Sequence, residues 1–157
     1  MYDRILVPLD GSALAEEALP HAKEMARKFG ADVVLFQAVM SLTEIAAQST
    51  ADASSGPETP EAIELAGRQL AAMTASGREY LEAMGAALQR EGIATSTRLA
   101  EGRPASAILA CARENGVALI AMSTHGRGGL GRLVLGSVAD EVLRNSDLPI
   151  LLIRSQG

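Results

Sequence analysis

Short runs of apolar residues recur along the chain and constrain its fold more than any other feature. They occupy residues 4–9, 32–39, 117–122 and 150–153, and nearly every position in them is apolar. A run of this kind is typical of a strand buried on both faces, as in a parallel sheet. Residues 93–100 instead alternate apolar and polar side chains, which predicts a further strand nearer an edge.

Helical patterns fill the intervals between these runs. Ser12 is a suitable N-cap for a first helix that Gly30 ends, and Pro20 inside it predicts a bend. A long pattern runs from Glu61 to the Glu91–Gly92 pair. Shorter patterns run from Pro104 to residues 115–116 and from about Ser137 to Arg144. Residues 41–60 are small and polar, and their composition predicts a flexible insertion or lid.

Strands that alternate with helices predict one α/β domain over residues 1–157, with a five-stranded parallel sheet and helices on both faces. The expected strand order is 3-2-1-4-5. Ligands bind such sheets at the carboxyl ends of the strands, where the order reverses. Residues 10–12 and 123–126 follow the first and fourth strands, so they should line this crevice. Arg103 and Pro104 could also face it, although nothing in the sequence requires this.

Composition excludes several classes of protein. The net charge of −5 argues against a nucleic-acid binder, and only 3% of residues are aromatic. One cysteine and two histidines argue against a cysteine- or histidine-rich metal centre. The sequence contains neither an apolar run of about 18 residues nor the apolar core of a signal peptide. We therefore expect a cytoplasmic protein with no membrane insertion.

The most unusual segment is rich in glycine. Four of the six residues in 126–131 are glycine, and Gly136 and Ser137 then open the last helix. No acidic residue lies between Glu114 and Asp140, whereas His125, Arg127 and Arg132 do. Glycines and a helix N-terminus suit a phosphate. Composition alone fits a plain flexible loop equally well, but the position at the crevice favours a phosphate site.

Two familiar phosphate motifs do not apply. The sequence has no G-x4-G-K-[S/T], which excludes a P-loop. Gly126, Gly128 and Gly131 do spell G-x-G-x-x-G, but a dinucleotide fold carries that motif after its first strand. The match is therefore interpreted as accidental. An adenylating enzyme's S-G-G-x-D-S loop is also absent after the first strand.

These residues resemble the universal stress protein family, whose ATP-binding members carry G-x2-G-x9-G-[S/T] before the last helix. Here the motif corresponds to Ser123-Thr-His-Gly126, nine further residues, and Gly136-Ser137. The opening Ile5-Leu-Val-Pro-Leu-Asp10-Gly11-Ser12 and the closing Leu148-Pro-Ile-Leu-Leu-Ile153 are also similar. The resemblance covers nearly the whole chain. Ser123 replaces the first glycine, and a positive φ there would cost about 1 kcal/mol.

The resemblance implies an adenine nucleotide alpha hydrolase-like, Rossmann-like domain that binds ATP or AMP, with Mg²⁺. Asp10 would hold the ribose, Ala38 the adenine edge, and the glycine segment the phosphates. It also implies a homodimer through the last strand, Ile150–Ile153. The expected nucleotide-binding residues are Pro8, Leu9, Asp10, Ala38, Met122, Ser123, His125, Gly126, Arg127, Gly136, Ser137 and Val138.

Three functions remain open at this point. The first is a nucleotide-binding regulatory module of stress physiology, and the second is a dimeric scaffold that works without a nucleotide. The third is a slow ATPase or another ATP-using enzyme. Residues 115–139 contain no carboxylate that would hold Mg²⁺ or orient water, so no catalytic residue is assigned. The sequence identifies no protein partner.

Overall fold

A computed structural model describes residues 1–51, 60–124 and 135–155 of the chain. Its centre is a five-stranded sheet in the order β3-β2-β1-β4-β5, with all neighbouring strands parallel. This confirms the predicted strand order and the α/β class. The strands are β1 (Arg4–Pro8), β2 (Asp32–Val39), β3 (Thr95–Glu101), β4 (Leu119–Thr124) and β5 (Ile150–Arg154).

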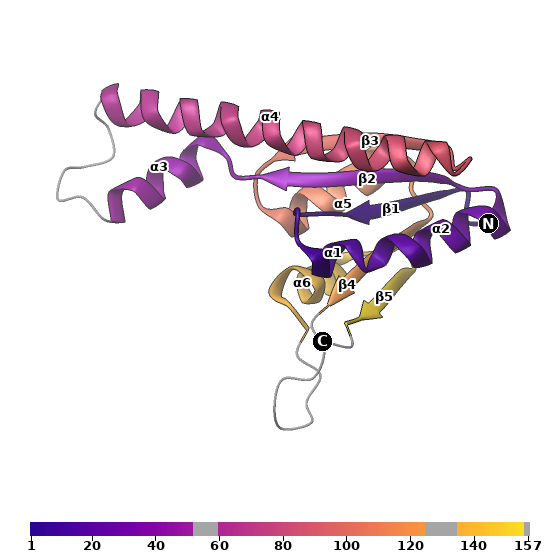
Figure 1. Cartoon of the computed structure of the whole chain (residues 1–157). Coiled ribbons are helices and arrows are strands. Elements are labelled where there is room, and N and C mark those ends of the chain that lie inside the picture. The colour runs from indigo at the N-terminus through magenta and orange to yellow at the C-terminus, as the bar shows by residue number, and fades with distance from the viewer. Residues whose placement is uncertain (52–59, 125–134, 156–157) are drawn as a thin grey trace.

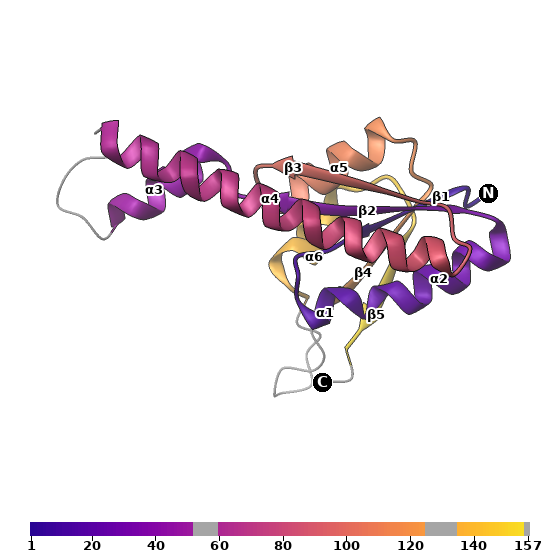
Figure 2. The same ribbon diagram turned by 45° about the horizontal axis from the view of Figure 1, so that its top comes forward.

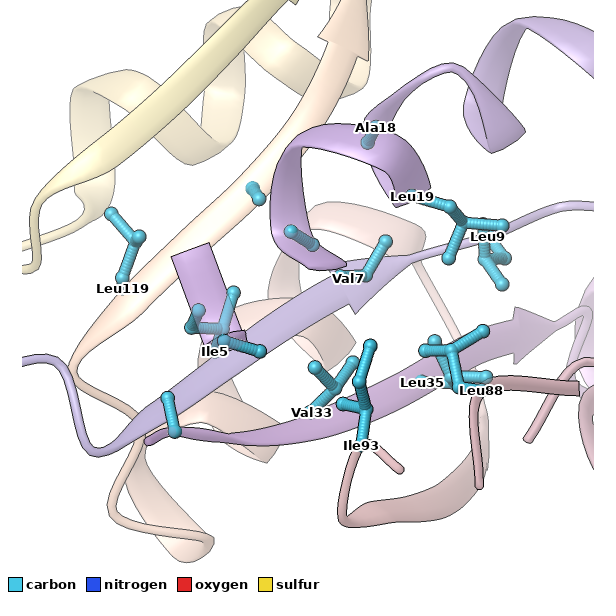
Figure 3. Close-up of a cluster of buried hydrophobic side chains, with 14 of the residues drawn as sticks. Ile5, Val7, Leu9, Ala18, Leu19, Val33, Leu35, Leu88, Ile93 and Leu119 are labelled. Atoms are coloured by element: carbon cyan, nitrogen blue, oxygen red, sulfur yellow. The ribbon is translucent and has the colours of Figure 1, made fainter. Parts of the chain in front are cut away.

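Helices cover both faces of the sheet (Figure 1). One face carries α1 (Ala13–Glu16), α2 (Ala18–Phe29) and α4 (Pro60–Arg90), and the other carries α5 (Pro104–Glu114) and α6 (Ser137–Asn145). Alternate side chains of β1 point to opposite faces of the sheet and join the hydrophobic core on each face. Ile5 and Val7 belong to the buried cluster that α2 and α4 help to form, part of which Figure 3 shows, whereas Leu6 belongs to the cluster formed with α5 and α6. This two-sided burial explains why the strands are almost continuously apolar.

The first helical segment corrects the prediction of one helix bent at Pro20. The chain instead breaks at Glu17, and α1 and α2 are separate helices. A proline ring clashes with the carbonyl four residues earlier and offers no N–H to it. For Pro20 that carbonyl belongs to Glu16. The Glu17 N–H accordingly donates to the Leu14 carbonyl at 3.2 Å, a tight terminal turn, and Pro20 lies in the first turn of α2.

The expectation of a flexible insertion over residues 41–60 is wrong for its first half, which forms α3 (Leu42–Ala51). Ser41 and Glu44 make a reciprocal capping box. The Ser41 N–H donates to Glu44 Oε2 at 2.7 Å, and the Glu44 N–H donates to Ser41 Oγ at 3.3 Å. The side chain of Ile45 is 1% exposed. Residues 52–59 lie outside the described part of the chain.

The long helix α4 packs on the sheet through its C-terminal half. Gly77 permits a close approach, because a Cβ there would lie 2.8 Å from Leu99 Cδ1 on β3. The N-terminal part of α4 contacts α3, and both extend beyond the sheet in Figures 1 and 2. None of the helices in the described ranges is long and apolar enough to cross a membrane.

Candidate functional site

A pocket of about 270 Å³ lies at the carboxyl ends of β1 and β4, where the strand order reverses. Parallel α/β sheets bind ligands at this position. The walls come from β1 and the turn after it, from β2, from β4, and from the first turns of α1, α5 and α6. The lining residues are Pro8, Leu9, Asp10, Ser12, Leu14, Ala15, Phe36, Ala38, Pro104, Ile108, Met122, Ser123, Thr124, Gly136, Ser137, Val138 and Ala139.

Asp10 is fixed at the mouth of this pocket by the turn after β1. Its Oδ1 accepts hydrogen bonds from the Ser12 N–H at 2.9 Å and the Ser12 hydroxyl at 2.5 Å. Gly11 between them has a φ of 81°, which favours glycine. The Ser12 hydroxyl also caps α1 by accepting from the Ala15 N–H at 3.1 Å. The exposed Asp10 carboxylate is therefore held in place with Oδ2 outside these bonds.

The opposite wall is the N-terminus of α6. Thr124 is 3% exposed, and its Oγ1 accepts from the Gly136 N–H at 3.3 Å, which anchors the start of the helix to the end of β4. Gly136 is the N-cap and supplies no side-chain cap to the first turn. The backbone N–H groups at a helix start carry partial positive charge and suit an anion. Ser137 and Val138, which open α6, both line the pocket.

Ser123, the residue that departs from the glycine motif, belongs to β4 and pairs with Ile153 of β5. Extended backbone suits serine, so the expected cost of a positive φ does not arise. Its Oγ is buried and has no hydrogen-bond partner among the described residues. A buried hydroxyl without a partner is uncommon, since it loses its bonds to water without replacement.

The remaining wall is apolar. Phe36 and Ala38 on β2, Ile108 on α5 and Met122 on β4 line this side, and Phe36 is only 1% exposed. Pro104 opens α5 here, as the sequence predicts for its first turn. A flat apolar ligand fits such a wall, whereas the Asp10 side and the start of α6 are polar.

A hydrogen bond ties the long helix α4 to the pocket wall. The Tyr80 hydroxyl donates to Glu16 Oε1 at 2.8 Å, and α1 carries both Glu16 and two lining residues. Burial, followed by the Glu16 bond, raises the pKa of Tyr80, and the nearby Asp10 charge adds to this. Tyr80 therefore remains a neutral hydrogen-bond donor beside these two carboxylates.

Nine of the residues expected at the site line this single pocket: Pro8, Leu9, Asp10, Ala38, Met122, Ser123, Gly136, Ser137 and Val138. His125, Gly126 and Arg127 lie outside the described residues. Ser12 and Thr124 also line the pocket, as expected for residues 10–12 and 123–126, whereas sequence reasoning missed Phe36 and Ile108. Phe36 carried a usable signal, since it lies two residues before Ala38 on the same strand and therefore on the same face of the sheet.

The described residues offer few ligands for a metal. They include no group of three or more His, Cys, Asp or Glu side chains able to hold a metal ion. Asp10 is the one carboxylate among the described residues that line the pocket. Mg²⁺ is commonly held by one or two carboxylates together with substrate phosphates, so Asp10 alone suits a cation that arrives with its ligand.

Fold and pocket together define a doubly wound α/β domain with a pocket at its switch point, polar at one end and apolar at the other. The model of the universal stress protein family matches residues 1–154. The chain therefore belongs to the universal stress protein family, as its resemblance implied. Universal stress protein MJ0531 of Methanocaldococcus jannaschii is 31% identical over 154 residues, which is 98% of this chain and 83% of that protein.

Solved structures agree with this assignment. The structure of hypothetical protein MJ0577 is 26% identical, with a TM-score of 0.78 over 100% of this chain and 99% of that one. A universal stress protein of Archaeoglobus fulgidus, solved with dAMP, has 22% identity and a TM-score of 0.58 over 97% and 98% of the two chains. A universal stress protein solved in complex with cAMP has 20% identity and a TM-score of 0.57, over 99% of this chain and 98% of that one. At these lower identities the likeness concerns the fold.

Proposed function

We propose that this chain binds ATP or AMP in the pocket between β1 and β4 and acts as a regulatory stress-response module. The main support for this proposal is that two features lie in the same pocket. The start of α6 presents N–H groups without a side-chain cap, and the fixed Asp10 carboxylate lies at the same mouth. An anion suits the first feature and ribose hydroxyls suit the second.

The three parts of a nucleotide match three parts of the pocket. The base would lie on the apolar wall, where Ala38 ends β2 and offers backbone groups to the adenine edge. The ribose hydroxyls would donate to Asp10, and the phosphates would accept from the N–H groups of Ser137 and Val138. Related proteins of the same fold were solved with cAMP and with dAMP, which supports an adenine nucleotide as the ligand class.

We further propose that the bound nucleotide is hydrolysed slowly or not at all. Fast phosphoryl transfer requires metal-held phosphates, a positioned nucleophile and charge stabilisation in the transition state. Asp10 is the one carboxylate of the described lining, and the ribose would occupy it. Mg²⁺ would neutralise phosphate charge when bound. A site of this kind stabilises the bound nucleotide without an evident device for the transition state.

Gly136→Asp is the sharpest test of the binding site. Gly136 has a φ of −59° and ψ of 151°, which any residue adopts, and Asp is a good N-cap. The new carboxylate would cap α6 and repel phosphate, so calorimetry should show AMP and ATP binding abolished while thermal stability is kept. Gly67→Asp on α4, where a Cβ meets nothing within 4 Å, is the matched control and should bind normally.

Two results would contradict the proposal. One is equal nucleotide affinity in Gly136→Asp and the parent chain, which would remove the phosphate from the start of α6. The other is a parent chain that binds neither AMP nor ATP in calorimetry and carries no nucleotide when the purified protein is denatured and analysed by mass spectrometry. A turnover of about 1 s⁻¹, in the range of ordinary enzymes, would overturn the binding-only role.

A second candidate function, a dimeric scaffold, is favoured by β5. This strand pairs with β4 on one side, and its other edge is not paired within the described chain. Ile150, Leu151 and Leu152 are only partly buried. Apolar edge strands invite pairing with another chain. We propose a homodimer through Ile150–Ile153, compatible with nucleotide binding, and light scattering should give about twice the chain mass of 16.3 kDa.

The hydrogen-bond pattern identifies the residue to change in that test. The Ile120 N–H donates to the Pro149 carbonyl, and the Ser155 N–H donates to the Thr124 carbonyl. The backbone N–H and C=O groups of odd-numbered β5 residues therefore bond to β4, and the backbone N–H of Leu152 points to the open edge of the sheet. Leu152→Pro removes an edge donor and should shift the protein toward monomer. A parent chain that is monomeric at micromolar concentration would contradict the dimer.

A further inference from the structure

One charged side chain at the pocket rim has no part in the site described so far. Arg103 is the N-cap of α5 and directly precedes Pro104, which lines the pocket. The preceding Gly102 donates its N–H to the Val39 carbonyl at 2.9 Å, at the end of β2. The backbone at Arg103 is therefore held close to the end of β2, the strand that carries the lining residue Ala38.

The guanidinium of Arg103 interacts with carboxylates of two further helices, α6 and α3. Its Nη2 is 3.4 Å from Glu141 Oε2 on α6, and its charge contributes to the lowered pKa of Glu44 on α3, after two hydrogen bonds from Ser41. The Arg103 side chain is 72% exposed. A long, exposed ion pair of this kind is weak and readily exchanged for another partner.

Among the described residues, the pocket lining offers no planar group for the outer face of a base. The chain has two tyrosines, two phenylalanines and no tryptophan. Of these aromatic residues, Phe36 is the one in the described lining, and at 1% exposure it lies in the floor. Arginine guanidinium planes stack on aromatic rings and on nucleic-acid bases, and they are less strongly hydrated than lysine.

We propose that Arg103 covers the outer face of the bound base and is a specificity-determining residue for a planar, aromatic base. This rests on the proposed nucleotide-binding function and deepens it. When the ligand enters, the guanidinium leaves Glu141 and stacks over the base, which the apolar wall supports from below. Arg103 therefore selects ligands by their base, whereas the start of α6 selects them by their phosphate.

Binding of adenosine, AMP and ribose 5-phosphate by Arg103 variants tests this division. Arg103→Ala should weaken adenosine and AMP about fivefold to tenfold and leave ribose 5-phosphate unchanged. Arg103→Lys keeps the charge without the plane and should show most of the same loss. Because Arg103 makes no side-chain cap bond, α5 should stay intact in both variants. Arg113→Ala, an exposed arginine at the far end of α5, is the matched control.

The contradicting outcomes are distinct. Equal losses for AMP and ribose 5-phosphate would make Arg103 a phosphate contact and overturn the stacking role. Unchanged adenosine and AMP affinity in Arg103→Ala would show that the guanidinium does not meet the base, with nucleotide binding itself intact. A parent chain that binds none of these ligands would contradict this inference and the proposed function together.

Discussion

The two ends of the same sheet are built in opposite ways. At the amino end, where β1, β2 and β4 begin, polar groups bond to one another. The Arg4 guanidinium donates to the Asn115 carbonyl and lies 3.7 Å from Asp32 Oδ2. The Asn115 side chain accepts from Arg98 Nε at 3.1 Å and donates to the Cys111 carbonyl at 2.8 Å. These bonds join β1, β2, β3 and α5 in one network.

At the carboxyl end, polar groups are fixed in position but keep hydrogen-bonding capacity that no described residue uses. Asp10 is held by Ser12 and remains exposed, the start of α6 has no side-chain cap, and Ser123 Oγ has no partner among the described residues. A pocket of about 270 Å³ separates these groups. The amino end is thus bonded internally, whereas polar groups at the carboxyl end stay available to a ligand, so we expect substitutions at the two ends to affect stability and binding separately.

Ile93→Ala, at the amino end, should have the largest effect. Ile93 is 5% exposed and lies beside Val33 and Leu88 in Figure 3. Removal of a buried isoleucine side chain leaves a cavity and should lower the free energy of unfolding by about 2–4 kcal/mol. Denaturant unfolding checks the loss, and AMP affinity should stay within about twofold. A large loss of affinity in the folded variant would contradict the separation.

Asp10→Ala, at the carboxyl end, should do the reverse. Loss of hydrogen bonds to a charged group should weaken AMP binding by about tenfold to a hundredfold, measured by calorimetry. The unfolding free energy should change by less than about 0.5 kcal/mol, because Asp10 is exposed and Ser12 still caps α1. Asp147→Ala, an exposed carboxylate at the amino end, controls for the charge change. Unchanged affinity in Asp10→Ala would remove the ribose contact.

Arg4→Ala should give a smaller effect on stability alone. The side chain is 42% exposed, so solvent screens its pair with Asp32 and most of the loss comes from the Asn115 carbonyl. We expect a decrease of about 1 kcal/mol in unfolding free energy and normal AMP binding. Arg90→Ala, an exposed arginine at the end of α4, is the control. A matching decrease there would show that the Arg4 network contributes nothing specific.

The smallest expected effect is a change in the pKa of two glutamate carboxyls, one at each end of the sheet. A hydrogen bond from Lys23 and then its charge, with Arg27, lower the pKa of Glu91, whereas hydrogen bonds from Ser41 lower the pKa of Glu44. Because both folded-state pKa values are depressed, their stabilisation is present above the ordinary glutamate pKa and is lost as the pH falls through the folded value.

Salt should distinguish the two carboxyls. At about 1 M NaCl, screening should raise the pKa of Glu91 toward its ordinary value and move that of Glu44 less. Carboxyl-carbon NMR titration at low and high salt measures both. Equal movement of the two would show that the Ser41 hydrogen bonds do not dominate at Glu44.

The apolar runs and the helix caps predicted the fold because each depends only on the residues of its own segment. Buried strands, the Gly30 turn and the first-turn position of Pro104 all follow from single segments, and all are confirmed. The α3 helix was missed, although the Ser41 to Glu44 spacing of a capping box was present in the sequence. Small polar residues outweighed that signal in the interpretation.

The candidate site was predictable where its residues lie at the ends of predicted strands. Asp10 and Ser123 follow from topology, because the carboxyl ends of β1 and β4 must be neighbours. Ala38 came from the family resemblance alone. Ile108 and the position of Arg103 against Glu141 depend on how α5 and α6 pack across the sheet, and no local pattern encodes that contact.

An amide NMR titration of the full chain with AMP tests most directly whether an adenine nucleotide binds at the carboxyl end of the sheet. The amides of Gly11, Ser12, Ser137 and Val138 should shift in a saturable manner, together with that of Ala38. Those of Gly30, Gly92 and Gly116, in the turns at the amino end, should not move. No shift at any concentration up to about 1 mM, the weak limit for a ligand of this kind, or shifts centred on the amino-end turns, would contradict the claim.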